Sequence, residues 1–311
     1  MKKAIITGPT GAIGIALIKQ LIEHRVEVVA VCRKGSARLK NLPVHSLVTC
    51  VEVDLDSLPE LPQIVDTSFD VFYHFGWDGT FGSTRNDLSR QLKNIQYTLE
   101  AVEVASKIGC KRFIGAGSQA EYGRVEGVCA ANTPPFPENG YGIAKLCAGQ
   151  MSRVLCEQMG LEHVWTRIFS IYGPYDAENT MIMSTIRSLQ NGDIPSLTKG
   201  EQEWDYLYSA DAGRAMYAIG EYGVHGKTYC IGSGTTRPLI EYVEILRDNI
   251  DKNAVLGIGQ REYAEKQVMH LCADITELSN DTSFKPVYSF EQGIKETINW
   301  YKQFKYKETN Y

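Results

Sequence analysis

Tyr141 and Lys145, in the stretch YGIAK, are the residues of this chain whose types and spacing first suggest chemistry. Residues four apart share one face of a helix, so the phenol and the ammonium can point into the same cleft. A nearby positive charge favours ionised tyrosine and lowers the pKa of the phenol, which makes it a usable acid or base near neutrality. The same spacing arises by chance on exposed helices, so the pair needs support from other residues.

A glycine-rich loop, TGPTGAIG, joins a β-prone run at residues 4–7 to an amphipathic stretch at residues 12–24. Glycines at such a junction let the backbone turn tightly and approach a pyrophosphate, and the helix N-terminus supplies free amides and a positive dipole. A simple turn is the alternative, but strand, loop and helix are all in place. The loop therefore predicts a dinucleotide site. Its candidate contacts are Gly8, Thr10, Gly11, Ile13 and Gly14.

The end of the next predicted strand, residues 26–32, bears on which dinucleotide binds. An acidic residue there would accept from a ribose 2′-hydroxyl and repel a 2′-phosphate, but Cys32 occupies the position. The residues that follow it include Arg33, Lys34, Ser36 and Arg38. This basic group suits a 2′-phosphate through charge-assisted hydrogen bonds, and a solvated basic loop is the alternative. We therefore expect NADP in preference to NAD, with Arg33 as the candidate contact.

Strands and helices alternate along the first part of the chain. The predicted strands lie at residues 4–7, 26–32, 50–53, 70–75, 112–116 and 163–169, and the long predicted helices span 84–108 and end near 159. This alternation implies right-handed βαβ units and a parallel sheet covered on both faces. We therefore expect a Rossmann-type doubly wound α/β domain at residues 1–172, which carries the catalytic residues. A smaller mixed α/β substrate-binding lobe follows at 173–311, with some segments returning to the first domain.

Composition and charge exclude several classes of protein. The 311 residues carry a formal net charge of -5 and no block of Lys or Arg, which argues against nucleic-acid binding. The apolar run after Lys3 is too short for a signal peptide or a membrane span, so we expect a cytoplasmic protein that does not bind membranes. The eight cysteines form no CxxC pair and do not cluster with histidine, so we expect reduced thiols and no metal site.

With Ser118 added to the glycine loop and the Tyr141/Lys145 pair, the chain resembles the extended short-chain dehydrogenases/reductases. Within that family it is most similar to the epimerases and dehydratases that act on nucleotide sugars, and the resemblance spans nearly the whole chain. Its pieces are TGPTGAIG, VDL at 53–55, DVFYHFGW at 70–77, Asn94, GAGSQAEYG at 115–123, YGIAK, RIFSIYGP at 167–174 and Trp300.

The resemblance implies catalytic roles for three residues. Ser118 would hold the sugar oxygen beside the Tyr141 phenol, and Lys145 would bind the nicotinamide ribose and tune Tyr141. In this family two helices often pack against a twin subunit, so the resemblance also implies a homodimer. The helix that precedes residue 108 and the helix that carries Tyr141 would form that contact.

The resemblance assigns four more residues to the cofactor. Asp54 would hydrogen-bond the adenine, with Leu55 packed beside it. His74 and Gly76 would line the nicotinamide side. Taken alone, His74 is also compatible with a packed residue on a strand.

One departure from the family concerns water elimination. Dehydratases follow the catalytic Ser or Thr with acids, whereas the next residues here are Gln119 and Ala120, and the acid comes one later, at Glu121. A slip of one residue on a strand turns a side chain to the opposite face. Dehydration is therefore disfavoured, and Gln119 becomes a candidate substrate contact.

Other departures concern the substrate. Ser170 replaces the asparagine that usually precedes the YGP turn, and Trp204 replaces an arginine that would grip the substrate phosphates. Trp204 can stack on a base or pack against the lobe. The segment WDGTFGSTRND at residues 77–87 should border the sugar site, where Trp77 and Arg85 either hold the sugar or its phosphates or pack within the loop.

These residues support three hypotheses about function. The leading one is a 4-ketoreductase of a nucleotide-linked 4-keto-6-deoxy sugar, in which Tyr141 delivers a proton to the sugar oxygen that Ser118 steadies. The alternative is a nucleotide-sugar 4-epimerase that retains NAD and gives the keto sugar room to rotate. A remote third is a non-catalytic dinucleotide sensor, which would not need Ser118, Tyr141 and Lys145.

Overall fold

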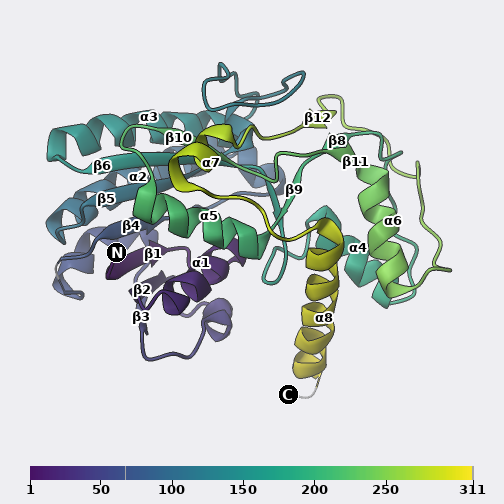
Figure 1. Ribbon diagram of the computed structural model, residues 1–311, viewed down its shortest axis with the longest axis horizontal. Helices are drawn as coiled ribbons and strands as arrows, with labels where there is room; N and C mark the ends of the chain where they lie inside the picture. Colours follow the sequence, from purple (N-terminus) through teal and green to yellow (C-terminus); the bar gives the residue numbers. More distant parts are fainter. Residues whose placement is uncertain (67, 310–311) are drawn as a thin grey trace.

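A seven-stranded parallel sheet forms the centre of the structure, a computed structural model that describes residues 1–66 and 68–309 (Figure 1). The order of its strands is β3, β2, β1, β4, β5, β6, β10. Because this order reverses between β1 and β4, a crevice forms there at the carboxyl ends of the strands. The strands are β1 (Lys3–Thr7), β2 (Glu27–Cys32), β3 (Val48–Glu52), β4 (Val71–His74), β5 (Arg112–Ser118), β6 (Glu162–Ile168) and β10 (Thr228–Ile231).

Helices cover both faces of this sheet, as Figure 1 shows, and the side chains of each strand alternate between them. Ala4 and Ile6 of β1 pack with the helices on one face, and Ile5 between them packs with those on the other. The first face carries α1 (Ala12–Glu23), α5 (Ser209–Tyr222) and α7 (Thr276–Thr282), and the second carries α2 (Leu88–Lys107) and α3 (Gly140–Met159). The expected Rossmann-type sheet is confirmed.

A smaller lobe follows, with a mixed sheet and helices around its own core. Its buried side chains include Tyr172, Ile186, Leu246, Ile294 and Ile298. Figure 1 shows the last helix extending away from the main sheet. The elements are β7 (Ser170–Tyr172), α4 (Met181–Gln190), β8 (Glu203–Trp204), β9 (Tyr206–Tyr208), β11 (Arg237–Pro238), α6 (Leu239–Ile250), β12 (His270–Leu271) and α8 (Phe290–Thr309).

The chain passes between the two parts more than once. After the first lobe elements it returns to the main sheet, where α5 packs against α1 and β10 pairs with β6. Short 3-10 helices fill several connections. They are η1 (Ala37–Asn41), η2 (Leu55–Gln63), η3 (Gly82–Asn86) and η4 (Gln119–Glu121).

The long helix α2 begins later than the sequence predicts, at Leu88 instead of residue 84. The carboxylate of Asp87 accepts a hydrogen bond from the Arg90 amide at 3.1 Å and caps the helix there, so η3 forms a separate turn. Within the described part of the chain, none of the helices has the length and apolar character that crossing a membrane requires.

Candidate active site

Ser118, Tyr141 and Lys145 meet where β5 ends and α3 begins. The side chain of Asn139 accepts from the Gly142 amide at 2.9 Å and starts α3 at this point, so Tyr141 and Lys145 fall on its first turns. All three predicted catalytic residues line one cavity of about 330 Å³, which we call the catalytic cavity. The Lys145 Nζ lies 5.8 Å from the centroid of the Tyr141 ring. The structure therefore brings the predicted acid/base residues together.

The surroundings of Tyr141 set how readily its phenol ionises. Burial raises the pKa of Tyr141, whereas a hydrogen bond with Ser118 and the charge of Arg85 lower it. The Arg85 guanidinium carbon lies 4.5 Å from the centroid of the Tyr141 ring. Arginine stays charged at any physiological pH. Arg85 thus supplies a charge that favours ionised Tyr141 and that the spacing of Tyr141 and Lys145 did not suggest.

The pKa of Lys145 is itself strongly shifted. Only 3% of the residue is exposed, and its ammonium donates to the Ala116 carbonyl at 2.5 Å. Its Nζ also lies 3.7 Å from the centroid of the Trp77 ring. Burial lowers the pKa of Lys145 to about 7, against the opposing charge of Glu121. The lysine therefore changes charge near neutral pH.

The acid that follows Ser118 points away from the catalytic cavity. Glu121 is fully buried, and its carboxylate accepts from the Ser118 amide at 2.9 Å and the Trp165 indole at 3.0 Å. The Arg167 guanidinium donates to its other oxygen at 2.8 Å. This carboxylate is committed to holding β5, η4 and β6 together.

A second cavity of about 550 Å³ adjoins the first and extends over the ends of β2 and β3; we call it the adenosine-side cavity. The two cavities share Gly8, Arg38 and Trp77. The predicted cofactor contacts divide between them. Thr10, Arg33, Asp54, Leu55 and Gly76 line the adenosine-side cavity, and Gly11, Ile13 and Gly14 line the catalytic cavity.

The glycine loop fits a dinucleotide by its own geometry. Gly8 has φ +67, and a Cβ there would meet the backbone of Gly76 at 2.8 Å. A Cβ at Gly14 would meet the Pro9 carbonyl oxygen at 2.5 Å, whereas one at Gly11 would face open space. The helix that follows has no side-chain cap and no acidic residue in its first turn. Its free amides are therefore available to a pyrophosphate.

His74 lies elsewhere than the resemblance implied. It lines neither cavity; its ring packs 6.0 Å from the Phe113 ring, between the sheet and its helices. Its Nδ1 forms a hydrogen bond with the Thr7 hydroxyl at 2.9 Å, and its Nε2 is buried without a partner. Burial lowers the pKa of His74 to about 3, so the ring stays neutral. It has the environment of a packed residue on a strand.

The predicted substrate contacts do not all gather in one place. Trp77 lines both the adenosine-side cavity and the catalytic cavity, whereas Arg85 covers Tyr141 and Gln119 is half-buried on η4. The Trp204 indole donates to the Ser170 hydroxyl at 2.8 Å, so these two residues hold each other. Trp204 also lines a cavity of about 560 Å³ between α4 and α6, the lobe cavity.

Two further residues of the site were not predicted from the sequence. Asp176 lines the catalytic cavity and accepts from the Ala177 amide at 2.8 Å; burial raises the pKa of Asp176 to about 6. Gln91 is 2% exposed and holds the 77–87 segment. A polar residue on the buried face of a long helix was the available signal for Gln91.

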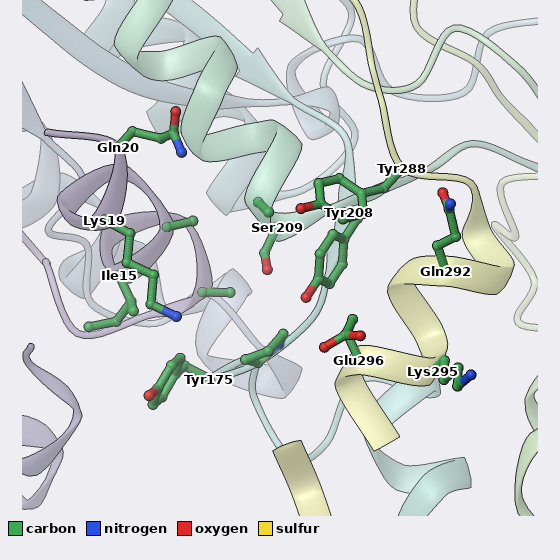
Figure 2. A pocket seen from close by; sticks show the side chains of 14 residues that line it. Ile15, Lys19, Gln20, Tyr175, Tyr208, Ser209, Tyr288, Gln292, Lys295 and Glu296 are labelled. Carbon is green, nitrogen blue, oxygen red and sulfur yellow. The ribbon is translucent and has the colours of Figure 1, made fainter. Parts of the chain in front are cut away.

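A larger cavity, of about 620 Å³, lies between α1, α5 and α8 (Figure 2). Lys19, Ser209 and Glu296 line it, and Tyr175 separates it from the catalytic cavity. None of the site residues predicted from the sequence lines it. Size alone therefore does not identify the active site.

The profile of the NAD dependent epimerase/dehydratase family matches residues 4–232. The chain belongs to this family. It is accordingly an enzyme of the extended short-chain dehydrogenase/reductase type, and the resemblance of its motifs to that family is confirmed. The family match covers the whole glycine loop, the adenosine-side cavity and all three predicted catalytic residues.

Individual relatives of this epimerase/dehydratase are distant. A dTDP-glucose 4,6-dehydratase of Neisseria meningitidis serogroup B is 23% identical, over 97% of this chain and 93% of its own. The solved UDP-N-acetylglucosamine 4-epimerase of Methanobrevibacter ruminantium M1 has a TM-score of 0.88 at 23% identity and covers 97% of this chain and 99% of its own. The UDP-glucose 4-epimerase of Thermotoga maritima has a TM-score of 0.87 at 21% identity, with the same coverage. These structures share the fold.

Replacing the loop glycines one at a time separates binding from folding. We expect Gly11→Ala to leave the free energy of unfolding within about 1 kcal/mol of the unmodified value. It should nevertheless weaken dinucleotide binding at least about tenfold, because the new methyl occupies the open space. We expect Gly14→Ala to cost about 2 kcal/mol through its overlap with Pro9. Urea unfolding and calorimetric titration measure both; undiminished binding by Gly11→Ala would contradict this placement of the pyrophosphate.

Removing Arg85 tests its effect on the phenol. We expect Arg85→Leu to raise the pKa of Tyr141, because the neighbouring charge that favours the phenolate disappears while burial remains. NMR titration of the ¹³Cζ-labelled tyrosines, with the signal assigned by Tyr141→Phe, measures the change. Arg90→Leu is the matched control, since Arg90 pairs with Asp78 on the same segment. An equal shift in both variants would show that Arg85 has no special effect.

Proposed function

We propose that this chain is a nucleotide-sugar oxidoreductase, first of all a 4-ketoreductase of a nucleotide-linked 4-keto-6-deoxy sugar. The observation that carries the proposal is that Ser118, Tyr141 and Lys145 line one cavity with the glycine loop, while Glu121 is withdrawn into a buried ion pair. The site thus has a proton donor for a sugar oxygen. At the position after Ser118 it lacks the acid that water elimination would use.

The residues of the site would divide the reaction between them. When bound, the reduced nicotinamide supplies the hydride that the keto carbon accepts. Ser118 donates a hydrogen bond to the keto oxygen, and Tyr141 transfers its phenolic proton to that oxygen as the alcohol forms. Lys145 and Arg85 place positive charge beside the phenolate that remains, which then regains a proton from solvent. Each turnover consumes one hydride and one proton.

A 4-epimerase with retained NAD is the second candidate. It would use the same three residues, with Tyr141 first accepting and then returning the proton. The solved structures with TM-scores of 0.88 and 0.87 are 4-epimerases, and this likeness favours it. The basic residues that line the adenosine-side cavity, Arg33 and Arg38, favour the reductase, because they suit the 2′-phosphate of NADP.

The lobe cavity is where we propose that the nucleotide of the substrate binds. It offers an apolar wall with the Trp204 ring. The side-chain oxygen of Gln202 is buried beside it without a partner, and that residue is 3% exposed. An unpaired buried acceptor is costly, so a donor group on a nucleotide base would relieve it. The base could also stack on the Trp204 ring, which lines the same cavity.

We also propose that α2 and α3 form the interface of a homodimer. The two helices pack side by side and expose apolar side chains. These are Leu88, Leu92, Ile143, Met151 and Val154, each at least 44% exposed. Apolar residues clustered on neighbouring helices mark interfaces. Sedimentation equilibrium of the purified chain tests this, and a monomer at assay concentration would refute it.

The activity can be tested with purified protein and dTDP- or UDP-linked 4-keto-6-deoxyglucose. We expect oxidation of NADPH coupled to reduction of the keto group, with Tyr141→Phe about 10³-fold slower because the proton donor is gone. Denaturation and mass spectrometry identify any retained cofactor. Tightly held NAD together with inversion at C4 of a UDP-sugar would establish the epimerase instead. Full turnover by Tyr141→Phe in either assay would exclude its acid/base role.

Cofactor preference has its own test. We expect Arg33→Ser to weaken NADPH binding about tenfold, the equivalent of about 1.4 kcal/mol, and to leave NADH binding unchanged. The reason is that the guanidinium would contact the 2′-phosphate that NADH lacks. Lys34→Ser is the matched control, since Lys34 is adjacent but does not line the adenosine-side cavity. Equal losses for both dinucleotides would mean that Arg33 does not select NADPH.

A further inference from the structure

The indole of Trp77 covers the Lys145 ammonium. Its ring centroid lies 3.7 Å from Nζ, and the Tyr141 ring meets the same indole edge-on with centroids 6.0 Å apart. Trp77 stands at the boundary between the adenosine-side cavity and the catalytic cavity. A cation over an indole face is attracted by the ring quadrupole, most strongly when the pair is shielded from water. Trp77 is thus in direct contact with both members of the Tyr141/Lys145 pair.

The segment around Trp77 is built to hold that ring in place. The Trp77 indole nitrogen donates to the Gln91 side-chain oxygen at 2.9 Å. The amide nitrogen of Gln91 in turn donates to the carbonyls of Gly79 at 2.9 Å and Thr84 at 3.0 Å. Asn94 pairs with the backbone of Asp78 in both directions, at 2.8 and 2.7 Å. Two buried amides of α2 therefore fix the path of the loop that carries Trp77.

We propose that Trp77 is a positioning residue, which binds the Lys145 ammonium through the face of its indole and aims it into the catalytic cavity. The inference deepens the proposed function, on which its catalytic consequence rests. An ammonium has three donors. One goes to the Ala116 carbonyl and a second faces the indole, so the third remains for the cavity. Gln91 acts on Lys145 indirectly, because its hydrogen bond to the Trp77 indole fixes that ring.

The charged groups around Lys145 give the sign of the effect. Glu121 on η4 favours the ammonium, and His74 on β4 is neutral. Tyr141 lies on the same helix as Lys145, and Arg85 on η3 covers Tyr141. The indole face stabilises the charged form of the lysine as Glu121 does. Loss of the indole should therefore make Lys145 give up its proton at lower pH.

The test follows the titration of Lys145 in the protein without substrate. NMR of ¹³Cε-lysine-labelled protein, with the signal assigned by Lys145→Arg, gives the midpoint, expected near the pKa of about 7. In Trp77→Leu we expect the midpoint to fall by about one pH unit, since the cation–π contact is lost. Trp77→Phe keeps an aromatic face but not the bond to Gln91. Its Lys145 midpoint should fall by less than half as much as that of Trp77→Leu.

Controls keep the two proposals separable. Tyr222→Leu removes an aromatic ring at an exposed position on α5 and should leave the Lys145 midpoint unchanged. An unmoved midpoint in a folded Trp77→Leu variant, judged by circular dichroism, would overturn the positioning role whatever the enzyme does. If Trp77→Leu does not fold, Trp77→Met, which also lacks an aromatic face, is titrated in its place, and an unmoved Lys145 midpoint there decides against the role. A shifted midpoint in an enzyme that reduces no keto sugar would leave Trp77 as proposed and refute only the reductase.

Discussion

The buried carboxylate of Glu121 is the constraint on which the geometry of the site depends. It joins the end of β5 to β6 through Arg167 and Trp165, and it receives the amide of Ser118. Charge buried to this extent is tolerated because these three donors bind the carboxylate and one of them is positively charged. Removing Glu121 or Arg167 alone would leave the other charge buried without its partner and cost about 3–5 kcal/mol. The Ser118 backbone is thereby fixed while its side chain still lines the catalytic cavity.

The groups that act on the ionisation of Tyr141 and Lys145 come from separate elements. Tyr141 and Lys145 share a helix, yet the groups that act on their charges come from η3, η4 and the loop after β4. Burial opposes both charged forms, because it disfavours phenolate and ammonium alike. Arg85 and Trp77 offset that penalty at short range. The eleven-residue segment at 77–87 thus supplies two of the groups that act on the charges of this pair.

Much of this was predictable from the sequence, and the remainder has a physical reason. The alternation of apolar strands and helices predicted the parallel sheet. The glycine loop predicted where on that sheet the dinucleotide site would lie. For His74 the sequence left two possibilities, because its place on a strand is compatible with packing while the motif around it implied a cofactor contact. The start of α2 was not predictable, because one carboxylate at Asp87 decides it. Gln91 and Trp77 meet because the segment at 77–87 folds back on α2. The spacing of apolar residues in the sequence does not predict such a contact.

The hydrogen bond between Trp77 and Gln91 also has a consequence for how these two positions evolve. The buried oxygen of Gln91 accepts from the indole at 2.9 Å, so a relative without the tryptophan would leave it only the longer contact with the Asn94 amide at 3.5 Å. In a relative with an apolar residue in place of Gln91, the indole N–H would lose its acceptor. The two positions should therefore change together in evolution. Their joint presence marks the relatives that share this arrangement of the lysine.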